Sequence, residues 1–173
     1  MSNWFKMWNA CSTPSLAVGT GTAVFENATA RTNRDGGVKS PGSLEPYTSI
    51  EIEHILPDTP TAELRQKWAT ENPTAVYDDY KNRLGNLTLL EKPINIVAGN
   101  DFYAEKQAEY RKSSNYLTRS LVELTNVGQN TSISRINEKL EAFPAWNAAS
   151  IEKRHSMLMA LARNVWKTTP IEV

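Results

Sequence analysis

The alternation of polar and apolar residues first predicts regular structure near residue 49. Residues 49–53 alternate polar and apolar side chains, and the run continues through His54 to Pro57. A period of two is typical of a half-buried strand, and proline ends such a strand because it has no backbone N–H. The apolar run Leu87 to Leu90 is also prone to form a strand. The pattern therefore predicts two short strands, about thirty residues apart.

Apolar residues at helical spacing predict helices between these two strands. Residues 61–70 carry two large apolar residues four positions apart, which places both on one helix face. Asn72 is expected to cap a second helix, because asparagine is favoured at that position and Pro73 follows it. This helix would end at Gly85, which tolerates the left-handed backbone conformation of a helix C-terminus.

The second half of the chain is predicted to be mainly helical. Asn100 or Asp101 is expected to cap a helix that ends near Ser113. Three further helical patterns follow, over residues 116–124, over residues 133–143 and from a cap at Ser150 to Trp166. The expected fold class is therefore α+β, with a small β element inside a mainly helical domain.

The composition of the first residues differs from that of the rest. Gly, Ser, Thr, Pro and Asn dominate residues 12–49, which are expected to form loops with one short strand at residues 22–25. We therefore divide the chain into a loop-rich segment of unassigned role and one domain. The segment is 1–48, and the domain is 49–167, with a core at about 49–113 and a helical shell at 114–167.

The charge balance and the cysteine content limit the class of protein. Nineteen lysines and arginines balance nineteen aspartates and glutamates, which excludes a histone-like tail but permits a local basic patch for nucleic acid. No apolar run is long enough to cross a membrane, and the first residues lack the apolar region of a signal peptide. One cysteine, Cys11, excludes a disulfide framework and a cysteine-based zinc site. We expect a cytoplasmic protein with no membrane partner.

Polar residues suited to phosphodiester cleavage lie on and beside the predicted strands. Glu53 and His54 end the first strand, Asn95 follows the second, and Lys106 lies in the next helix. Histidine is the usual general base near neutral pH. Carboxylate and amide oxygens suit Mg²⁺ or Mn²⁺ rather than zinc, and a lysine can place a point charge beside a phosphate. These residue types predict metal-dependent hydrolysis in which the histidine deprotonates water.

Two motifs link this arrangement to a known family. Residues 52–57 read Ile-Glu-His-Ile-Leu-Pro, residues 83–90 read Arg-Leu-Gly-Asn-Leu-Thr-Leu-Leu, and Asn95 and a Phe-x-x-x-Lys pair at residues 102–106 follow. In this order the motifs resemble the HNH, or ββα-metal, nucleases. More narrowly, they resemble the DUF1524 branch, the C-terminal nuclease domain of GmrSD-type modification-dependent restriction enzymes. The resemblance covers about residues 49–167 and implies a ββα-metal core.

The resemblance implies a role for each matching residue. His54 matches the general base. Asn86 matches the middle asparagine, which steadies the hairpin and orients the base. Glu53 and Asn95 match the two metal ligands, although Glu53 is one methylene longer than the aspartate that many HNH enzymes carry.

A lysine completes the predicted site. Lys106 matches a lysine of the same branch and lies one helical turn from both Phe102 and Tyr110. We expect the two aromatic side chains to pack while Lys106 reaches the scissile phosphate. Glu51 shares a strand face with Glu53 and is a candidate hydrogen-bond partner of the metal site.

Several residues also have ordinary structural interpretations. His54 could be a core histidine, Asn100 is the alternative to Asn95 as a ligand, and Lys106 could be a solvated surface lysine. Arg154 is expected to form a salt bridge within the helical shell rather than to contact a phosphate, and His155 is expected at the surface. The core is expected to contain Trp68, Trp146 and Trp166.

The resemblance implies a function in restriction or antiviral defence. The chain would be a divalent-metal-dependent endonuclease that cleaves DNA to leave 5′-phosphate and 3′-hydroxyl ends, with Mg²⁺ as the expected metal and Mn²⁺ as the alternative. The Asp-Gly-Gln-Gln-Arg motif of a DUF262-type nucleotide-hydrolysing sensor does not occur in the sequence. The chain would therefore be an excised nuclease domain, would act with a sensor on a separate polypeptide, or would act alone. Two other functions stay open: a nucleic-acid-binding or assembly module with a decayed site, and an RNA-cleaving toxin.

Overall fold

The structure, a computed structural model, describes residues 49–125 and 132–166. Strand β1 spans Ile50–His54 and strand β2 spans Leu87–Glu91. The helices are α3 (Ala62–Glu71), α4 (Tyr77–Lys81), the 3-10 turn η3 (Leu84–Asn86), α5 (Lys92–Ala98), α6 (Tyr103–Tyr110), α7 (Tyr116–Arg119), α8 (Ser132–Asn137) and α9 (Ala148–Trp166). The strand expected at residues 22–25 lies outside the described residues.

The pairing of β1 with β2 decides which side chains share a face. The strands are antiparallel, with Ile50 opposite Glu91 and His54 opposite Leu87. Since successive side chains of a strand point to opposite faces, Glu53 and His54 face different neighbours. One face carries Glu51, Glu53, Thr88 and Leu90, and the other carries Ile50, Ile52, His54, Leu87 and Leu89.

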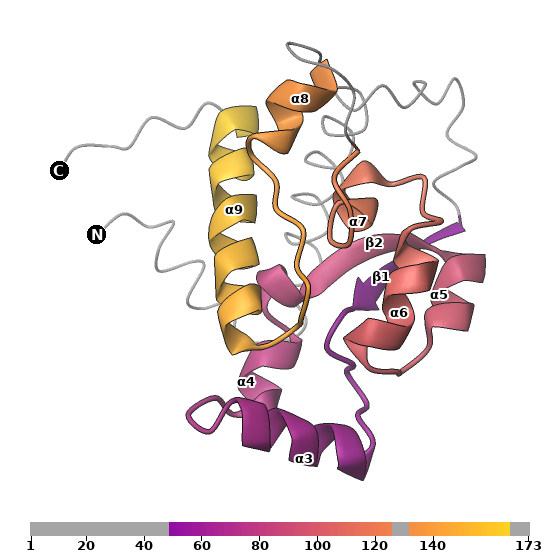
Figure 1. Ribbon diagram of the computed structural model, residues 1–173, viewed down its shortest axis with the longest axis vertical. Coiled ribbons are helices and arrows are strands. Elements are labelled where there is room, and N and C mark those ends of the chain that lie inside the picture. The colour runs from indigo at the N-terminus through magenta and orange to yellow at the C-terminus, as the bar shows by residue number, and fades with distance from the viewer. Residues whose placement is uncertain (1–48, 126–131, 167–173) are drawn as a thin grey trace, which may run out of the picture.

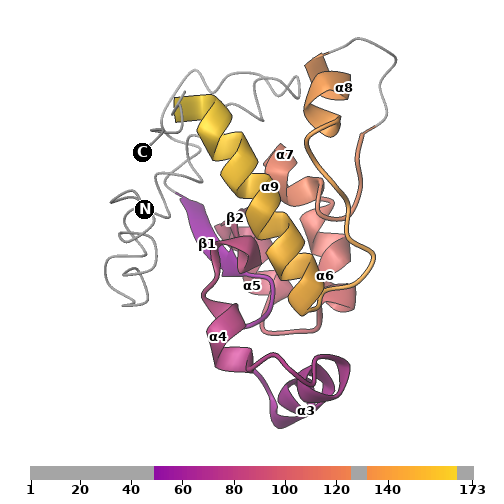
Figure 2. The ribbon, with the colours of Figure 1, turned by 90° about the vertical axis from the view of Figure 1, so that its left-hand side faces the viewer.

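Helices cover both faces of the strand pair. Figure 1 shows the pair at the centre, with α5 and α6 on one side and the long helix α9 on the other. Figure 2 shows α3 at the end of the molecule, beyond α4. Among the described residues, one apolar cluster includes Leu90, Tyr110 and Trp146, and a second includes Leu89, Tyr116 and Leu158. The strands thus separate two parts of the core.

The observed architecture confirms the α+β class and both predicted strands. Helix α5 begins directly after β2 and packs against both strands, whereas α3, α4 and η3 separate β1 from β2 along the chain. Trp68 and Trp146 are buried as expected, whereas the side chain of Trp166 lies outside the described part. No helix among residues 49–125 and 132–166 is long and apolar enough to cross a membrane.

The prediction that Asn72 starts a helix is wrong. Asn72 ends α3, because its backbone N–H and its side-chain Nδ2 both donate to the carbonyl oxygen of Trp68, at 2.8 and 3.0 Å. The next helix, α4, begins only at Tyr77, and Val76 is exposed rather than packed. A short polar side chain can form hydrogen bonds with the free backbone groups at either end of a helix. The sequence alone therefore did not show whether Asn72 begins a helix or ends one.

Gly85 is also explained differently from the prediction. Gly99 is the glycine with a positive φ in the described part of the chain, at 54°, so Gly85 does not adopt the left-handed conformation. Instead, a Cβ atom at residue 85 would overlap the carbonyl oxygen of Ile151 in α9. Glycine is therefore needed because η3 and α9 approach each other closely.

Helix α5 and several helix ends differ from those that the sequence pattern predicts. Pro93 in the first turn of α5 and Gly99 at its C-terminus are the signals that could have revealed this helix. Helix α6 begins at Tyr103, two residues later than the expected cap at Asp101. Helices α7 and α8 end before the predicted boundaries, and the Asn147 side chain, not Ser150, caps α9 by accepting a hydrogen bond from the Ser150 N–H at 3.0 Å.

Candidate active site

His54 lies at the end of β1 and is partly exposed. Its Nε2 atom is 3.2 Å from Oδ1 of Asn82, an exposed residue just before η3. An amide oxygen accepts hydrogen bonds, so in this pairing Nε2 donates and Nδ1 of the neutral ring carries the lone pair. Asp58 lies near His54, and a hydrogen bond from Lys81 is the largest cause that lowers the pKa of Asp58. The His54 ring is thus partly exposed and lies near the charged pair of Asp58 and Lys81.

Asn86 is completely buried and fixes the chain around His54. Its Oδ1 atom accepts from the Leu56 N–H at 2.7 Å and from Nε1 of Trp146 at 2.9 Å. Its Nδ2 group donates to the carbonyl oxygens of Leu56 and Lys81, at 2.9 and 2.7 Å. These bonds hold the segment just after His54, so Asn86 acts on the position of the histidine through the main chain.

Glu53 and Lys106 form an ion pair in the interior. The Lys106 Nζ atom is 2.6 Å from Glu53 Oε1 and 2.9 Å from the carbonyl oxygen of His54, and Tyr110 donates to the same carboxylate oxygen at 2.7 Å. The Lys106 and Glu53 side chains are only 1% and 7% exposed. Burial lowers the pKa of Lys106, and the adjacent Glu53 charge opposes this effect. Lys106 is therefore neither a solvated surface lysine nor open to a substrate phosphate in this arrangement.

The packing expected around Lys106 is found for Tyr110, which is fully buried. Burial is the largest cause that raises the pKa of the Tyr110 hydroxyl, and the Glu53 charge adds to it. Phe102 is only partly buried, and the Lys67 ammonium lies 4.6 Å from its ring centroid. Phe102 thus lies at the boundary between the core and the surface.

Asn95 belongs to a different network from Glu53. Its Nδ2 group donates to Glu51 Oε2 at 2.9 Å, and Lys92 Nζ is 3.4 Å from the other oxygen of Glu51. The hydrogen bond from Asn95 is the largest cause that lowers the pKa of Glu51. Glu51 was expected to be a hydrogen-bond partner of the metal site, and the predicted ligand with which it forms this bond is Asn95.

The predicted metal ligands Glu53 and Asn95 consequently do not meet in this arrangement. Over the described ranges, no three or more His, Cys, Asp and Glu side chains cluster so as to hold a metal ion. Mg²⁺, however, often takes only one or two carboxylates and keeps several waters. Both carboxylates are paired with a lysine, but the pair of Glu51 with Lys92 is exposed and the pair of Glu53 with Lys106 is buried. Glu51 and Asn95 are thus the accessible oxygen donors.

Two residues of α9 differ from expectation. Arg154 is buried within the shell, but Nη1 donates to the carbonyl oxygens of Gly85 and Leu87, at 2.8 and 2.6 Å. Burial lowers the pKa of Arg154 to about 9, and with 0% exposure its side chain does not contact a phosphate. His155 is partly buried rather than at the surface, and burial, followed by the Arg83 charge, lowers its pKa. The sequence offered no signal that Arg154 would bind main-chain carbonyls.

A partly exposed histidine held beside a rigid strand pair is the kind of group that phosphodiester hydrolases use as a base. The model of one family, described as GmrSD restriction endonucleases, C-terminal domain, matches residues 21–161. The match covers most of the chain, which therefore belongs to this family, and the resemblance inferred from the motifs is confirmed. The matched region begins inside the segment 1–48, to which the sequence analysis assigned no role. Neither a curated protein nor a solved structure is significantly similar to the chain.

Proposed function

We propose that this chain is a divalent-metal-dependent endonuclease of the HNH type that hydrolyses DNA in restriction or antiviral defence. Membership of a family of restriction endonucleases supports the nuclease activity. The observation that carries the proposal is the partly exposed imidazole of His54 at the end of β1, on the motif that resembles the HNH nucleases. Helix α5 follows β2 directly and packs against both paired strands, which supports a ββα core.

His54 is the proposed general base. Because Nε2 donates to Asn82, Nδ1 of the neutral ring accepts a proton from the attacking water. The water oxygen forms a bond to phosphorus, the bond between phosphorus and the 3′-oxygen breaks, and that oxygen takes a proton from solvent. The products are a 5′-phosphate and a 3′-hydroxyl end.

Asn86 and Lys106 are proposed as positioning residues. Asn86 binds both backbone groups of Leu56, and Lys106 Nζ binds the carbonyl oxygen of His54 itself. The main chain at His54 and just after it is thus tied to buried groups, which limits how far the ring can move. Such preorganisation is what a general base needs in order to meet its water in the correct geometry.

Glu51 and Asn95 are the residues that we propose to hold the divalent cation, Mg²⁺ or Mn²⁺. A carboxylate and an amide provide the hard oxygen donors that these ions prefer, and both side chains are partly exposed. Glu51 lies on the face of β1 opposite His54 and three residues before it, so a bound cation would supply positive charge to a DNA phosphate on that side of the strand. In this proposal Glu51 replaces Glu53, whose carboxylate is paired with Lys106.

Plasmid cleavage by the full chain tests the base. With Mg²⁺ or Mn²⁺, wild type should nick or linearise plasmid DNA and EDTA should stop the reaction. His54→Ala should lose at least about 10²-fold in rate, because a general base contributes about 10²–10⁴-fold. His155→Ala, which changes the other histidine of the described region, is the matched control and should retain activity. A His54→Ala protein that cleaves at the wild-type rate would refute the assignment.

The same assay separates the remaining alternatives. An RNA substrate of similar length, run in parallel, should be cleaved more slowly than DNA. Preferential cleavage of RNA would indicate the toxin function. Binding of either nucleic acid without cleavage in any metal would indicate a decayed site.

A metal titration tests the ligands separately from the base. Asn95→Ala and Glu51→Gln should each raise the Mg²⁺ concentration at half-maximal activity, because a cation with two protein ligands depends strongly on each. Asn100→Ala is the control and should leave this midpoint unchanged. If neither Asn95→Ala nor Glu51→Gln moves the midpoint, the cation is not held by this pair.

Target selection is proposed to come from a partner. The chain has zero formal net charge, so its binding to DNA should be weak and should depend only modestly on salt. A DUF262-type sensor, as another domain or protein, would then supply nucleotide control and recognition. A footprint of tight, sequence-specific binding by this chain alone would contradict that division of labour.

A further inference from the structure

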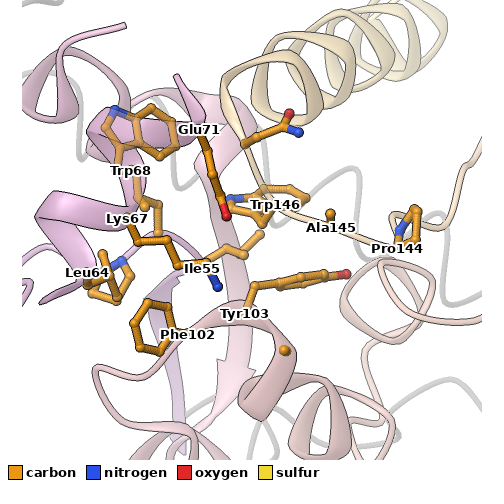
Figure 3. A pocket seen from close by; sticks show the side chains of 14 residues that line it. Ile55, Leu64, Lys67, Trp68, Glu71, Phe102, Tyr103, Pro144, Ala145 and Trp146 are labelled. Carbon is orange, nitrogen blue, oxygen red and sulfur yellow. The ribbon is translucent and has the colours of Figure 1, made fainter. Parts of the chain in front are cut away.

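A pocket of about 160 Å³ lies beside the end of β1, and the proposed chemistry does not use it. Figure 3 shows that four aromatic residues line it from three separate segments. Trp68 comes from α3, Phe102 and Tyr103 come from the start of α6, and Trp146 comes from the stretch before α9. The pocket is therefore built from the tertiary fold rather than from one loop.

The pocket is joined directly to the residue that we propose as the base. Residues 55–57, which follow His54 without a gap, form part of its wall. Asn86 Oδ1 accepts both from the Leu56 N–H at 2.7 Å and from Nε1 of Trp146 at 2.9 Å. One buried side chain thus holds a ring of the pocket and the strand end in a fixed relation.

The polar atoms of the lining rings are already satisfied inside the protein. Trp68 Nε1 donates to the carbonyl oxygen of Ala75 at 2.8 Å, and the Tyr103 hydroxyl lies 2.9 Å from the carbonyl oxygens of Leu121 and Phe143. The Tyr103 and Trp146 rings lie 5.2 Å apart, centroid to centroid. Trp68, Tyr103 and Trp146 are 4%, 8% and 8% exposed, so the aromatic lining is formed in advance and each of these rings presents only a small part of its surface to the pocket.

The edge of the pocket carries charge. Lys67 and Glu71 are exposed lining residues on α3, and Lys67 Nζ is 4.6 Å from the centroid of the Phe102 ring. A lysine that covers an aromatic ring at the mouth of an apolar pocket offers a contact for an anion next to a planar group. Nucleotides combine such a planar apolar base with a phosphate.

We propose that this pocket receives one unstacked nucleobase of the nucleic-acid substrate, with Lys67 beside an adjoining phosphate. The proposal deepens the proposed nuclease function and rests on it. The volume is below the range of about 300–1,000 Å³ that is typical of drug-sized ligands, so one ring system is the appropriate occupant. Proteins that take a base out of the stack hold it between aromatic or apolar side chains, and that contact tolerates different bases.

Filling the pocket provides the test. Ala104 and Ala108 are both exposed on α6 and lie one turn apart, but only Ala104 lines the pocket. Ala104→Phe should block it, and Ala108→Phe is the matched control. The tryptophan fluorescence of the full chain is followed during titration with two single-stranded DNA oligomers of equal length, one of mixed sequence and one in which every nucleotide is abasic.

Wild type and Ala108→Phe should bind the mixed-sequence oligomer at least about tenfold more tightly than the abasic oligomer. Ala104→Phe should bind both oligomers with the same, weaker affinity. Equal affinity of wild type for the two oligomers would overturn the proposal, and so would a base preference that survives in Ala104→Phe. A fluorescence response to N-acetylphenylalaninamide but not to either oligomer would also overturn it, and would indicate a pocket for a protein side chain.

Plasmid cleavage by the same proteins separates this proposal from the nuclease function. If wild type cleaves and His54→Ala does not, but wild type binds the two oligomers with equal affinity, only the proposal of a nucleobase pocket is wrong. If the base preference is present and blocked by Ala104→Phe but wild type cleaves neither DNA nor RNA, only the nuclease activity is wrong.

Discussion

Glu53 and His54 are consecutive residues of β1, yet their side chains lie in opposite environments. The Glu53 side chain is 7% exposed, and one of its carboxylate oxygens accepts from both Lys106 and Tyr110. His54 is partly exposed, and its ring lies 3.2 Å from the exposed side chain of Asn82. The alternation of a strand is sufficient to separate the two groups.

This difference suggests a division of roles between the two faces of the strand. A buried ion pair with all partners in place fixes geometry, and it is costly to disturb because either charge left alone remains in the interior. A partly exposed imidazole can exchange protons with water and substrate. We therefore expect changes at the Glu53–Lys106 pair to act mainly on stability, and changes at His54 to act mainly on cleavage.

The largest expected loss of stability follows from Lys106→Met. Removing the ammonium leaves the Glu53 carboxylate buried without its charged partner, which should lower the free energy of unfolding by about 3–5 kcal/mol. Lys112→Met changes a lysine on the same side of the fold whose side chain is 60% exposed, and it should cost less than about 0.5 kcal/mol. Urea unfolding of the three proteins measures both changes.

A double variant sharpens this test. Glu53→Gln combined with Lys106→Met leaves no unpaired charge, so it should recover a large part of the stability that Lys106→Met loses. If Lys106→Met costs no more than Lys112→Met, the lysine is not held in the interior, and the phosphate contact expected from the sequence becomes the better explanation.

Asn86→Ala is expected to have the next largest effect. It removes a buried side chain that makes four hydrogen bonds and leaves backbone groups of Leu56 and Lys81 without that partner. Buried polar groups that lose their partner cost about 1–3 kcal/mol each, so a loss of at least about 2 kcal/mol is expected. Thermal unfolding checks this value, and a stability equal to that of wild type would contradict the positioning role.

Asn82→Ala should have a smaller effect, and it should change the cleavage rate rather than the stability. Asn82 is exposed, so its removal should change the free energy of unfolding by less than about 0.5 kcal/mol. The cleavage rate should nevertheless fall several-fold, because the His54 ring loses the hydrogen bond that selects its tautomer. An unchanged single-turnover rate would show that Asn82 does not orient the base.

The two strands could be predicted from the sequence, because they depend on local signals. Residues 49–57 alternate and end in proline, and β1 occupies Ile50–His54 as a result. The motif around Asn86 similarly indicated a residue important for the strand pair. Helix α5 was missed because only one of its residues is buried, which left no apolar stripe to detect.

The partners of the charged residues could not be predicted, because they depend on tertiary packing. The sequence gives Lys106 the same appearance as any lysine of a polar helix, but α6 packs so that Nζ reaches Glu53 and the carbonyl of His54. The pairing of Asn95 with Glu51 likewise joins residues that are 44 positions apart. Gly85 is a further case, since its requirement arises from the approach of α9.

The smallest expected effect concerns pH and the second histidine. The pKa of His155 is lowered in the folded state, mainly by burial, so the unfolded chain binds the additional proton first as pH falls below about 6.5. The stability associated with the neutral ring is therefore present above that pH and is lost as pH falls toward the folded pKa. His155→Asn should remove this part of the pH dependence of urea unfolding. If the free energy of unfolding changes with pH identically in wild type and His155→Asn between pH 5 and about 6.5, the prediction is wrong.

Chemical rescue of His54→Gly measures most directly whether His54 is the base. In single-turnover cleavage of plasmid DNA with saturating Mg²⁺, the account predicts that His54→Gly loses at least about 10²-fold in rate while its unfolding midpoint stays near that of wild type. Added imidazole should then raise the rate in proportion to the concentration of its neutral form. A His54→Gly protein that cleaves at the wild-type rate and does not respond to imidazole would contradict the account.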